Sequence, residues 1–430
     1  MPFKSLATFR SNVLKIHMLI VISDLHLSDG TSCHNLSHRA FSHFFDYIKG
    51  SMRKEYEELI VVFAGDTFDL LRSEYWMTVE EGEKPWNNSS GERRAWSVEK
   101  KPNLKSSSQP SALSSQLNNP PYHPHLKHLL SNAIEANNTS LDIIRQADKQ
   151  FHPIPIQKYL IPGNHDRMIG EIDGYNDILK DAFGNISIVN ECYENEAYGV
   201  VIKHGHEFDI YNFEADGIPI GDVNTVELFV RLPFEIKKKF PELEDELKSI
   251  GDIRPQWRIF DYLQSTYTEH EVKSFIEESI EKTVNYFFTI PYVREWIKKH
   301  DTIYPFDEAD KLKYLLYLSK ILPMDWVEKL LKIFSYFETK EPHYEEMAEK
   351  ENALYVAYGH THKENVSFLG VANGFHRYYI NTGTWRERII ASNSGVFSQY
   401  KTMTYAIFYR KEERQTEFPA FELWNGALRE

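Results

Sequence analysis

The chain of 430 residues is poor in cysteine. It contains only Cys33 and Cys192, and neither belongs to a C-x-x-C pair. This count excludes a disulfide framework and a thiolate zinc site. It favours a protein that works in a reducing compartment.

Long apolar runs are also missing. The run "MLIVI" at 18–22 has five residues, whereas a membrane span needs roughly 18 to 20. The basic opening segment "MPFKSLATFRSNVLK" is not followed by an apolar stretch and a small-residue cleavage site. We therefore expect a cytoplasmic protein that is soluble, unsecreted and without a transmembrane segment.

An excess of positive charge is absent as well. Lys and Arg number 49 against 63 Asp and Glu, and the formal net charge is −14. This balance disfavours broad binding to nucleic acid, because neutralising phosphates requires clustered Lys and Arg. A local basic groove is compatible with it, so nucleic acid is a disfavoured partner but not an excluded one.

The sequence is rich in short apolar runs that end in polar, glycine-containing turns. Their length and their Val, Ile and Tyr content predict buried strands, each with a loop at its C-terminal end. Strands buried on both faces need layers above and below them. The runs are "MLIVISD" (18–24), "ELIVVFAGD" (58–66), "QKYLIPGNHD" (157–166), "YGVVIKHGH" (198–206), "ALYVAYGHTH" (353–362), "RYYINTGTW" (377–385), "MTYAIFYR" (403–410) and "FPAFELWN" (418–425).

A helix is predicted between the first two of these strands. Residues 37–58 place Phe41, Phe44, Phe45 and Ile48 at helical spacing. The resulting β-α-β start favours an α/β sandwich over an all-β barrel.

Two segments interrupt the strand pattern. Residues 85–121 are rich in Ser, Asn, Pro and Lys, which predicts a flexible loop. Residues 222–350 have apolar residues at i, i+3, i+4 and i+7, which predicts a helical insertion or cap. We expect residues 15–221 and 351–430 to form one core around this insertion. The helical runs are "VNTVELFVRLPFEIKKKF", "HEVKSFIEESIEKTVNYFF", "DEADKLKYLLYLSKIL" and "MDWVEKLLKIFSYFE".

Five of the predicted strand-end loops carry carboxylate, carboxamide or imidazole side chains. Each block alone is a weak signal, but five in this order, each behind a strand, form a strong one. The blocks are "SDLH" (Asp24, His26), "GDTFD" (Gly65, Asp66, Asp69), "GNHD" (Gly163, Asn164, His165, Asp166), "HGH" (His204, His206) and "GHTH" (Gly359, His360, His362).

These residue types suit a pair of divalent metal ions. Two metals about 3.5–4 Å apart can clamp a phosphoryl group and activate a bridging water. A carboxylate has two oxygens with which to bridge them, and Asp66 is the natural choice. Imidazoles suit Zn, Fe or Mn better than Mg. Glycines in three of the blocks allow sharp turns and a close approach to the metals.

The five blocks resemble the calcineurin-like metallophosphoesterase superfamily, whose D-x-H, G-D-x-x-D, G-N-H-[DE], later His and G-H-x-H blocks all occur here in the same order. The flanking words "ISDLHL", "HGHEFD" and "NTGTW" are similar to the branch of UDP-2,3-diacylglucosamine hydrolases, over the motif blocks only. The resemblance implies a four-layer α/β/β/α sandwich with a large helical insertion. It also implies two divalent ions, for which we expect Mn²⁺, with Fe or Zn as alternatives.

The resemblance implies a role for each block. The first metal would be held by Asp24, His26 and His362, and the second by Asn164, His204 and His360, with Asp66 bridging them. His165 would stabilise the transition state or protonate the leaving group, and Asp166 would orient it.

Some polar residues near the blocks have open roles. Asp69 either orders a neighbouring ligand or caps the following turn. His206 either makes a functional contact or is packed for structural reasons. Three arginines either meet a substrate phosphate or are exposed and solvated, and the second reading is favoured. They are Arg167, Arg386 and Arg388.

The expected function is that of a dinuclear metal-dependent phosphoesterase. It would hydrolyse a phosphodiester, pyrophosphate or phosphomonoester in a small or lipid-linked substrate, by in-line attack of a metal-bridging hydroxide. Two alternatives stay open: a nuclease of the same superfamily, and a non-catalytic scaffold that binds partners through its helical insertion.

Overall fold

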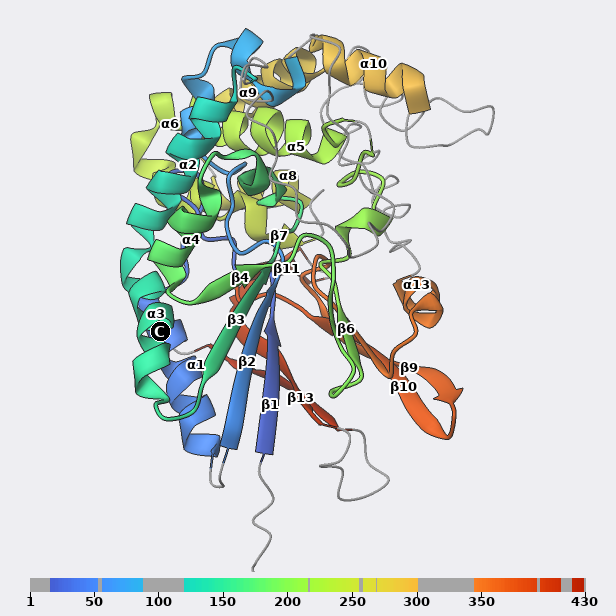
Figure 1. The fold of residues 1–430 in the computed structure, drawn as a ribbon. Helices are drawn as coiled ribbons and strands as arrows, with labels where there is room; N and C mark the ends of the chain where they lie inside the picture. The colour runs from blue at the N-terminus through green and yellow to red at the C-terminus, as the bar shows by residue number, and fades with distance from the viewer. Residues whose placement is uncertain are drawn as a thin grey trace, which may run out of the picture.

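Two β-sheets packed face to face, with helices against them, form a mixed α/β structure in the computed structural model (Figure 1). The structure describes residues 16–52, 56–87, 120–215, 217–254, 258–267, 269–300, 344–392, 395–410 and 420–428. Two of the predicted helical runs, "DEADKLKYLLYLSKIL" and "MDWVEKLLKIFSYFE", lie outside these residues, as does most of the predicted loop 85–121.

The larger sheet has six strands in the order β14-β13-β1-β2-β3-β4. The strands β1 to β4 run parallel, whereas β13 pairs antiparallel with both β1 and β14. The carboxyl ends of β1, β2 and β3 therefore lie along one edge. The strands are β1 (Ile16–Ile22), β2 (Tyr56–Ala64), β3 (Ile156–Ile161), β4 (Ile186–Ile188), β13 (Thr402–Tyr409) and β14 (Phe421–Ala427).

The smaller sheet has five strands in the order β5-β6-β8-β10-β9. Its central strands β6, β8 and β10 are parallel. A third sheet joins β12, β11 and β7. The strands are β5 (Tyr193–Asn195), β6 (Val200–Ile202), β7 (Ile253–Arg254), β8 (Tyr355–Tyr358), β9 (Glu364–Ala372), β10 (Phe375–Thr382), β11 (Arg388–Ala391) and β12 (Phe397–Tyr400).

All the strands predicted from the apolar runs are confirmed, and β1 shows why the prediction held. Leu19 and Val21 point into the core between the two sheets, where they meet Ile202 and Ala357 of the smaller sheet. Met18, Ile20 and Ile22 belong to the core on the opposite face, under the helices. Side chains alternate along a strand, so burial on both faces requires a continuous apolar run.

Four helices cover the outer face of the larger sheet (Figure 1). The predicted helix 37–58 is shorter than expected. Ser37 caps it by accepting a hydrogen bond from the Arg39 amide, the helix ends at Ser51, and β2 has begun by Tyr56. The helices are α1 (His38–Ser51), α2 (His123–Ala136), α3 (Asn138–Gln150) and α4 (Tyr175–Phe183).

The predicted insertion, residues 222–350, is mainly helical where the structure describes it, with one short strand, β7. Its core includes Ile389 of β11, so it packs on the C-terminal part of the chain. No described helix is both long and apolar enough to cross a membrane. The elements are α5 (Ile220–Asn224), a π-helical turn η6 (Thr225–Val230), α6 (Arg231–Lys239), α7 (Glu244–Lys248), α8 (Ile259–Thr266), α9 (His270–Phe287), α10 (Pro291–His300) and, beyond the gap, α13 (Tyr344–Lys350).

Short 3-10 turns complete the secondary structure. One of them, Pro85–Asn87, begins the predicted loop 85–121 and has its Trp86 buried, so the first residues of that segment form an ordered turn. The turns are η1 (Glu74–Met77), η2 (Glu81–Glu83), η3 (Pro85–Asn87), η4 (Arg167–Glu171), η5 (His206–Phe208), η7 (Pro241–Leu243) and η8 (Ile250–Asp252).

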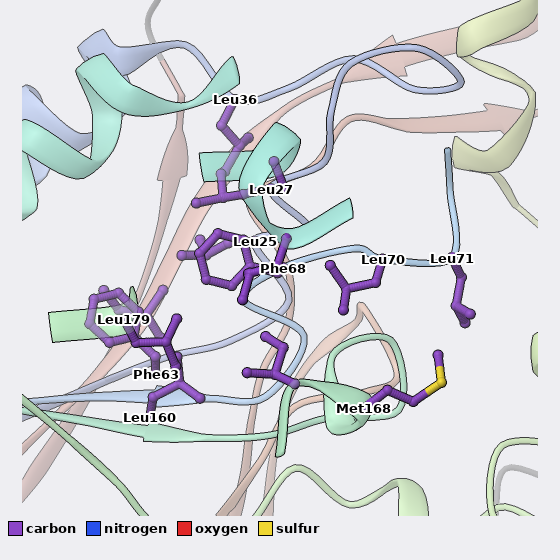
Figure 2. Packing of buried hydrophobic residues seen from close by; sticks show 14 of the residues in the cluster. Leu25, Leu27, Leu36, Phe63, Phe68, Leu70, Leu71, Leu160, Met168 and Leu179 are labelled. Carbon is purple, nitrogen blue, oxygen red and sulfur yellow. The ribbon is translucent and has the colours of Figure 1, made fainter. Parts of the chain in front are cut away.

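Apolar side chains fix the loops that follow β1, β2 and β3. In "DLHL" the residues Leu25 and Leu27 alternate with Asp24 and His26, and the two leucines are buried in the helix-side core. Figure 2 shows Leu25 and Leu27 gathered with Phe68, Leu70 and Met168, which come from the other two loops. Each loop therefore directs apolar side chains into the core and leaves its polar ones at the edge of the sheet.

Trp385 provides a test of the helix-side core. It is fully buried, and its ring centroid lies 5.4 Å from that of Phe41 and 5.3 Å from that of Phe44. Its Nε1 donates a hydrogen bond to the Thr404 carbonyl at 2.8 Å. Trp385→Ala should lower the free energy of unfolding by about 3–5 kcal/mol, through lost burial and a cavity. Urea denaturation followed by circular dichroism measures this.

Val396→Ala is the control for this measurement. Val396 is 66% exposed, so its truncation should change the free energy of unfolding by no more than about 0.5 kcal/mol. Equal midpoints for the two variants would show that Trp385 does not support the core.

Candidate metal centre

The loops after β1, β2 and β3 of the larger sheet lie next to the loops after β6 and β8 of the smaller sheet. Backbone bonds join the loops: the His26 amide donates to Asp66 O at 2.8 Å, and the Gly359 amide donates to His204 O at 3.0 Å. The His360 amide reaches the Asp24 carboxylate at 3.0 Å and connects the two sheets. The predicted blocks are thus brought together in space.

Strained backbone is concentrated in these loops. A left-handed φ is uncommon for residues other than glycine, and it persists where surrounding structure enforces it, often at functional sites. Of the six non-glycine residues with positive φ in the described chain, all but Asn373 are predicted metal ligands. They are Asp24 (54°), His26 (47°), Asp66 (49°), His360 (70°) and His362 (58°).

A first group consists of Asp24, His26, Asp66 and His362, whose ligand atoms all lie within 4.8 Å of one another. The His26 and His362 Nε2 atoms are 2.9 Å apart, and His362 Nε2 is 3.4 Å from Asp24 Oδ1. Nitrogen and carboxylate oxygen atoms therefore converge from three loops on one small volume. This donor set fits a divalent ion of the Mn, Fe or Zn type.

A second group consists of Asp66, His204 and His360. The Asn164 Oδ1 atom joins it, at 3.1 Å from His204 Nε2 and 3.0 Å from His360 Nδ1. This group too presents mixed nitrogen and oxygen donors.

Asp66 belongs to both groups. Its Oδ2 lies 3.6 Å from His26 Nε2 and 3.3 Å from His204 Nε2, while its Oδ1 accepts a hydrogen bond from the His165 amide at 2.8 Å. The carboxylate is 1% exposed. Asp66 is therefore the residue placed to bridge two ions.

Outer partners set the orientation of the histidine rings. His26 Nδ1 faces Asp69 Oδ2 at 3.0 Å, His204 Nδ1 faces the Ala64 carbonyl at 2.9 Å, and His360 Nε2 faces Asp209 Oδ2 at 3.0 Å. Each acceptor keeps a proton on the outer nitrogen, so the inner nitrogen can offer a lone pair to a metal.

Close packing around the ligands requires glycine at two of the turns. A Cβ atom on Gly163 would lie 2.2 Å from Asp66 Oδ1, and one on Gly359 would lie 2.4 Å from Asp24 Oδ2. Any side chain at these positions would displace a carboxylate of the site.

The prediction for Asp166 needs correction. Its carboxylate accepts hydrogen bonds from the backbone amides of Thr67, Phe68 and Gly163, at 2.8, 3.1 and 2.6 Å. The group facing His165 is Asp69, whose Oδ1 lies 2.9 Å from His165 Nδ1. Asp166 follows His165 in sequence, but its side chain points back into the loop after β2, where it holds two turns together.

Asp69 therefore has both of the roles left open for it. One oxygen faces His26 and the other faces His165, and Oδ1 also accepts from the Arg72 amide at 3.0 Å, which caps the following turn. Asp69, His26 and His165 are themselves close enough to form a metal-binding group. We assign this group to hydrogen bonding, because 2.9 and 3.0 Å are ordinary hydrogen-bond lengths.

The interpretation of the arginines as exposed and solvated is wrong. Arg386 is 4% exposed and forms a bidentate ion pair with Asp252. Arg388 donates to the His362 carbonyl at 3.0 Å and pairs with Glu364. Arg167 likewise pairs with Asp222.

His206 lies beside the second group, with its ring centroid 5.3 Å from that of His204 and 6.4 Å from that of His360. Its Nδ1 is buried without a hydrogen-bond partner in the described residues. Sequence reasoning missed Asp209, although it lies within the quoted word "HGHEFD". It also missed Arg254, whose Nη2 lies 3.3 Å from His362 Nδ1.

Burial and neighbouring charge set the protonation of the ligands. Burial lowers the pKa of His26 to about 3, and burial with the Arg254 and Arg72 charges lowers that of His362 well below its usual value. Both rings of the first group are therefore neutral near pH 7. Burial opposes protonation of His204, but the Asp66 charge overcomes it and raises the pKa to about 10.

The two groups should therefore differ in how they respond to pH. His204 is protonated below its pKa of about 10, so an ion entering the second group must displace that proton, and affinity should rise with pH through the neutral range. We expect the His204→Gln variant to release about one proton fewer on saturation with Mn²⁺ than the wild type. Calorimetry at pH 7 in two buffers of different ionisation enthalpy counts the protons. An identical count in both proteins would contradict this assignment.

The shared position of Asp66 makes a second prediction, about stoichiometry. Asp66→Asn should lose both ions, His362→Ala only the first and His360→Ala only the second, as determined by elemental analysis after dialysis against Mn²⁺. Asp173→Asn, at an exposed position, should keep both. Loss of a single ion from Asp66→Asn would show that the carboxylate does not bridge.

All the predicted ligand side chains thus lie in two groups that share one carboxylate. Their donors, imidazole nitrogen with carboxylate and carboxamide oxygen, suit borderline divalent ions. A scan of the sequence against protein-family models and a search of curated proteins found no match.

Proposed function

We propose that the chain is a metal-dependent phosphoesterase with two divalent ions, of the metallophosphoesterase type that its five blocks resemble. The observation that carries the proposal is the buried Asp66 carboxylate, shared by two His/Asp groups. Mn²⁺ is the ion we favour, because each group combines hard oxygen donors with imidazole.

The arrangement of layers supports the same proposal. Helices α1 to α4 lie on one sheet, the two sheets share a core, and α13 packs on the far face of the smaller sheet through Tyr344 and Ala348. We propose that these elements form an α/β/β/α sandwich in which residues 222–350 are an insertion.

The bound ions would act as Lewis acids on the phosphate oxygens and activate a water for attack. The residues of the two groups would hold these ions at the carboxyl ends of the strands. With the ligand rings neutral, two dipositive ions would outweigh the charges of the Asp24 and Asp66 carboxylates, so the loaded site would attract an anionic ester.

His165 is suited to deliver a proton to the leaving oxygen. Burial opposes protonation of the ring, but the charges of Asp69 and Asp66 raise its pKa above the usual value. Asp69 holds Nδ1, which leaves Nε2 as the atom able to reach a substrate. With 12% of its side chain exposed, His165 is more accessible than His26 or His204.

The test is hydrolysis of bis-p-nitrophenyl phosphate and p-nitrophenyl phosphate by the Mn²⁺-loaded protein. We expect wild type to cleave at least one of them, and Asp66→Asn to be inactive. His165→Asn should keep both ions but lose about 10²–10⁴-fold in kcat, the range of one general acid. Asp173→Asn should be as active as wild type.

Two results would contradict the proposal. The first is a wild-type protein that binds two Mn²⁺ ions but cleaves neither ester nor a series of pyrophosphate substrates. The second is turnover that is unchanged in Asp66→Asn.

A further inference from the structure

The turn at 209–212 contacts the second metal group from outside. The Asn212 side chain lies between Asn164, a predicted ligand, and Asp209. Its Oδ1 accepts a hydrogen bond from Asn164 Nδ2 at 3.3 Å, and its Nδ2 donates to Asp209 Oδ2 at 2.7 Å. Asp209 Oδ2 also faces His360 Nε2 at 3.0 Å. One carboxamide thus connects two predicted ligands that come from different sheets.

The Asn164 carboxamide must present its oxygen to a metal ion. Its NH₂ group has only donors, and rotation of the carboxamide by half a turn would exchange the two ends. Asn164 Oδ1 faces His204 Nε2 at 3.1 Å and His360 Nδ1 at 3.0 Å. Within the part of the chain that the structure describes, Asn212 is the only hydrogen-bond partner of Asn164 Nδ2. This contact therefore favours the orientation in which the oxygen faces the metal site.

A different contact holds the backbone of Asn164. The Arg167 guanidinium donates to the Asn164 carbonyl and pairs with the buried Asp222 of helix α5. Loss of the Asn212 side chain would leave this attachment intact. The effect of Asn212 should therefore be confined to the side chains of the second group.

Asn212 is itself fixed by its own turn and by helix α5, at the start of the predicted insertion. Its amide donates to the Asp209 carbonyl at 3.0 Å, and the Gly221 amide of α5 donates to the Tyr211 carbonyl at 2.7 Å. A Cβ atom on Gly221 would lie 2.5 Å from Asn212 Oδ1. The oxygen that meets Asn164 thus packs directly on the backbone of α5.

We propose that Asn212 is a positioning residue of the second metal group. It holds the Asn164 carboxamide directly, and the His360 ring through Asp209, in the orientations that a metal ion needs. This role rests on the proposed function, because it assumes an ion in that group. Asn212 touches neither the ion nor the substrate, and outer partners of this kind contribute about 10–100-fold to metal affinity.

Titration of single-ion variants with Mn²⁺ tests this role without turnover. The His362→Ala protein should keep only the second ion, and in it Asn212→Ala should weaken Mn²⁺ binding by about tenfold or more. The His360→Ala protein should keep only the first ion, and in it Asn212→Ala should leave the Mn²⁺ affinity unchanged. Isothermal titration calorimetry of the full chain measures both affinities.

Gly221→Ala is a second variant, in which Asn212 is kept. Gly221 lies in helix α5 and has no positive φ, so alanine suits its backbone. The added Cβ would press on Asn212 Oδ1 and on the Tyr211 carbonyl, so Gly221→Ala should weaken binding of the second ion in the same selective way. Asn190→Ala, at an exposed position, is the matched control and should bind Mn²⁺ in both backgrounds as the parent proteins do.

Two results would overturn the inference. One is an Asn212→Ala protein that binds the second ion as tightly as its His362→Ala parent. The other is an equal loss of Mn²⁺ affinity in both backgrounds, which would mean that Asn212 supports the fold of the whole site. Failure of the proposed function is distinguishable from both, because it appears in the wild type, as two bound Mn²⁺ ions without cleavage of any phosphate ester.

Discussion

The compensation of one buried charge governs the arrangement of the loops. A carboxylate taken out of water is costly unless hydrogen bonds and opposite charges surround it. Asp66 obtains them from outside its own strand, through the His165 amide after β3 and the His204 ring after β6. The charges of His204 and His165 outweigh the effect of burial and hold the pKa of Asp66 well below its usual value. The two sheets must therefore end at the same level for this residue to be satisfied.

The site is strained locally and supported by its surroundings. Left-handed backbone at non-glycine residues costs about 1–3 kcal/mol each, and the ligand loops adopt it repeatedly. The support comes from the apolar side chains between the ligands, such as Leu25 and Leu27, which are buried under the loops (Figure 2). In these segments the same few residues provide both the chemistry and the attachment to the core.

The strands and the ligand loops could be predicted because both depend on local patterns. An apolar run followed by a polar turn is visible in the sequence, and parallel strands place such turns at a common edge. The partner of His165 could not be predicted in this way. Asp166 was the predicted partner because it follows His165 in sequence. The direction of a side chain depends on the backbone of its loop, however, and it is Asp69 in the loop after β2 that faces the His165 ring, while Asp166 accepts from the Gly163 amide.

Arg254 is the harder case. It is 108 residues from His362 in sequence, and it reaches the site only because the short strand β7 pairs with β11. A two-residue strand within a mainly helical segment has no periodicity to detect. Contacts of this kind depend on tertiary pairing, which no local pattern in the chain specifies.

Asp252 connects the insertion to the rest of the chain. It stands at the entry of β7, yet its carboxylate neutralises Arg72, which follows β2, and Arg386, which follows β10; both arginines are buried. Removing the Asp252 carboxylate would take the paired carboxylate from Arg386 and leave Arg72 with Asp69, 3.6 Å away. A change at Asp252 is therefore coupled to positions 72 and 386, which lie far from it in sequence and outside residues 222–350.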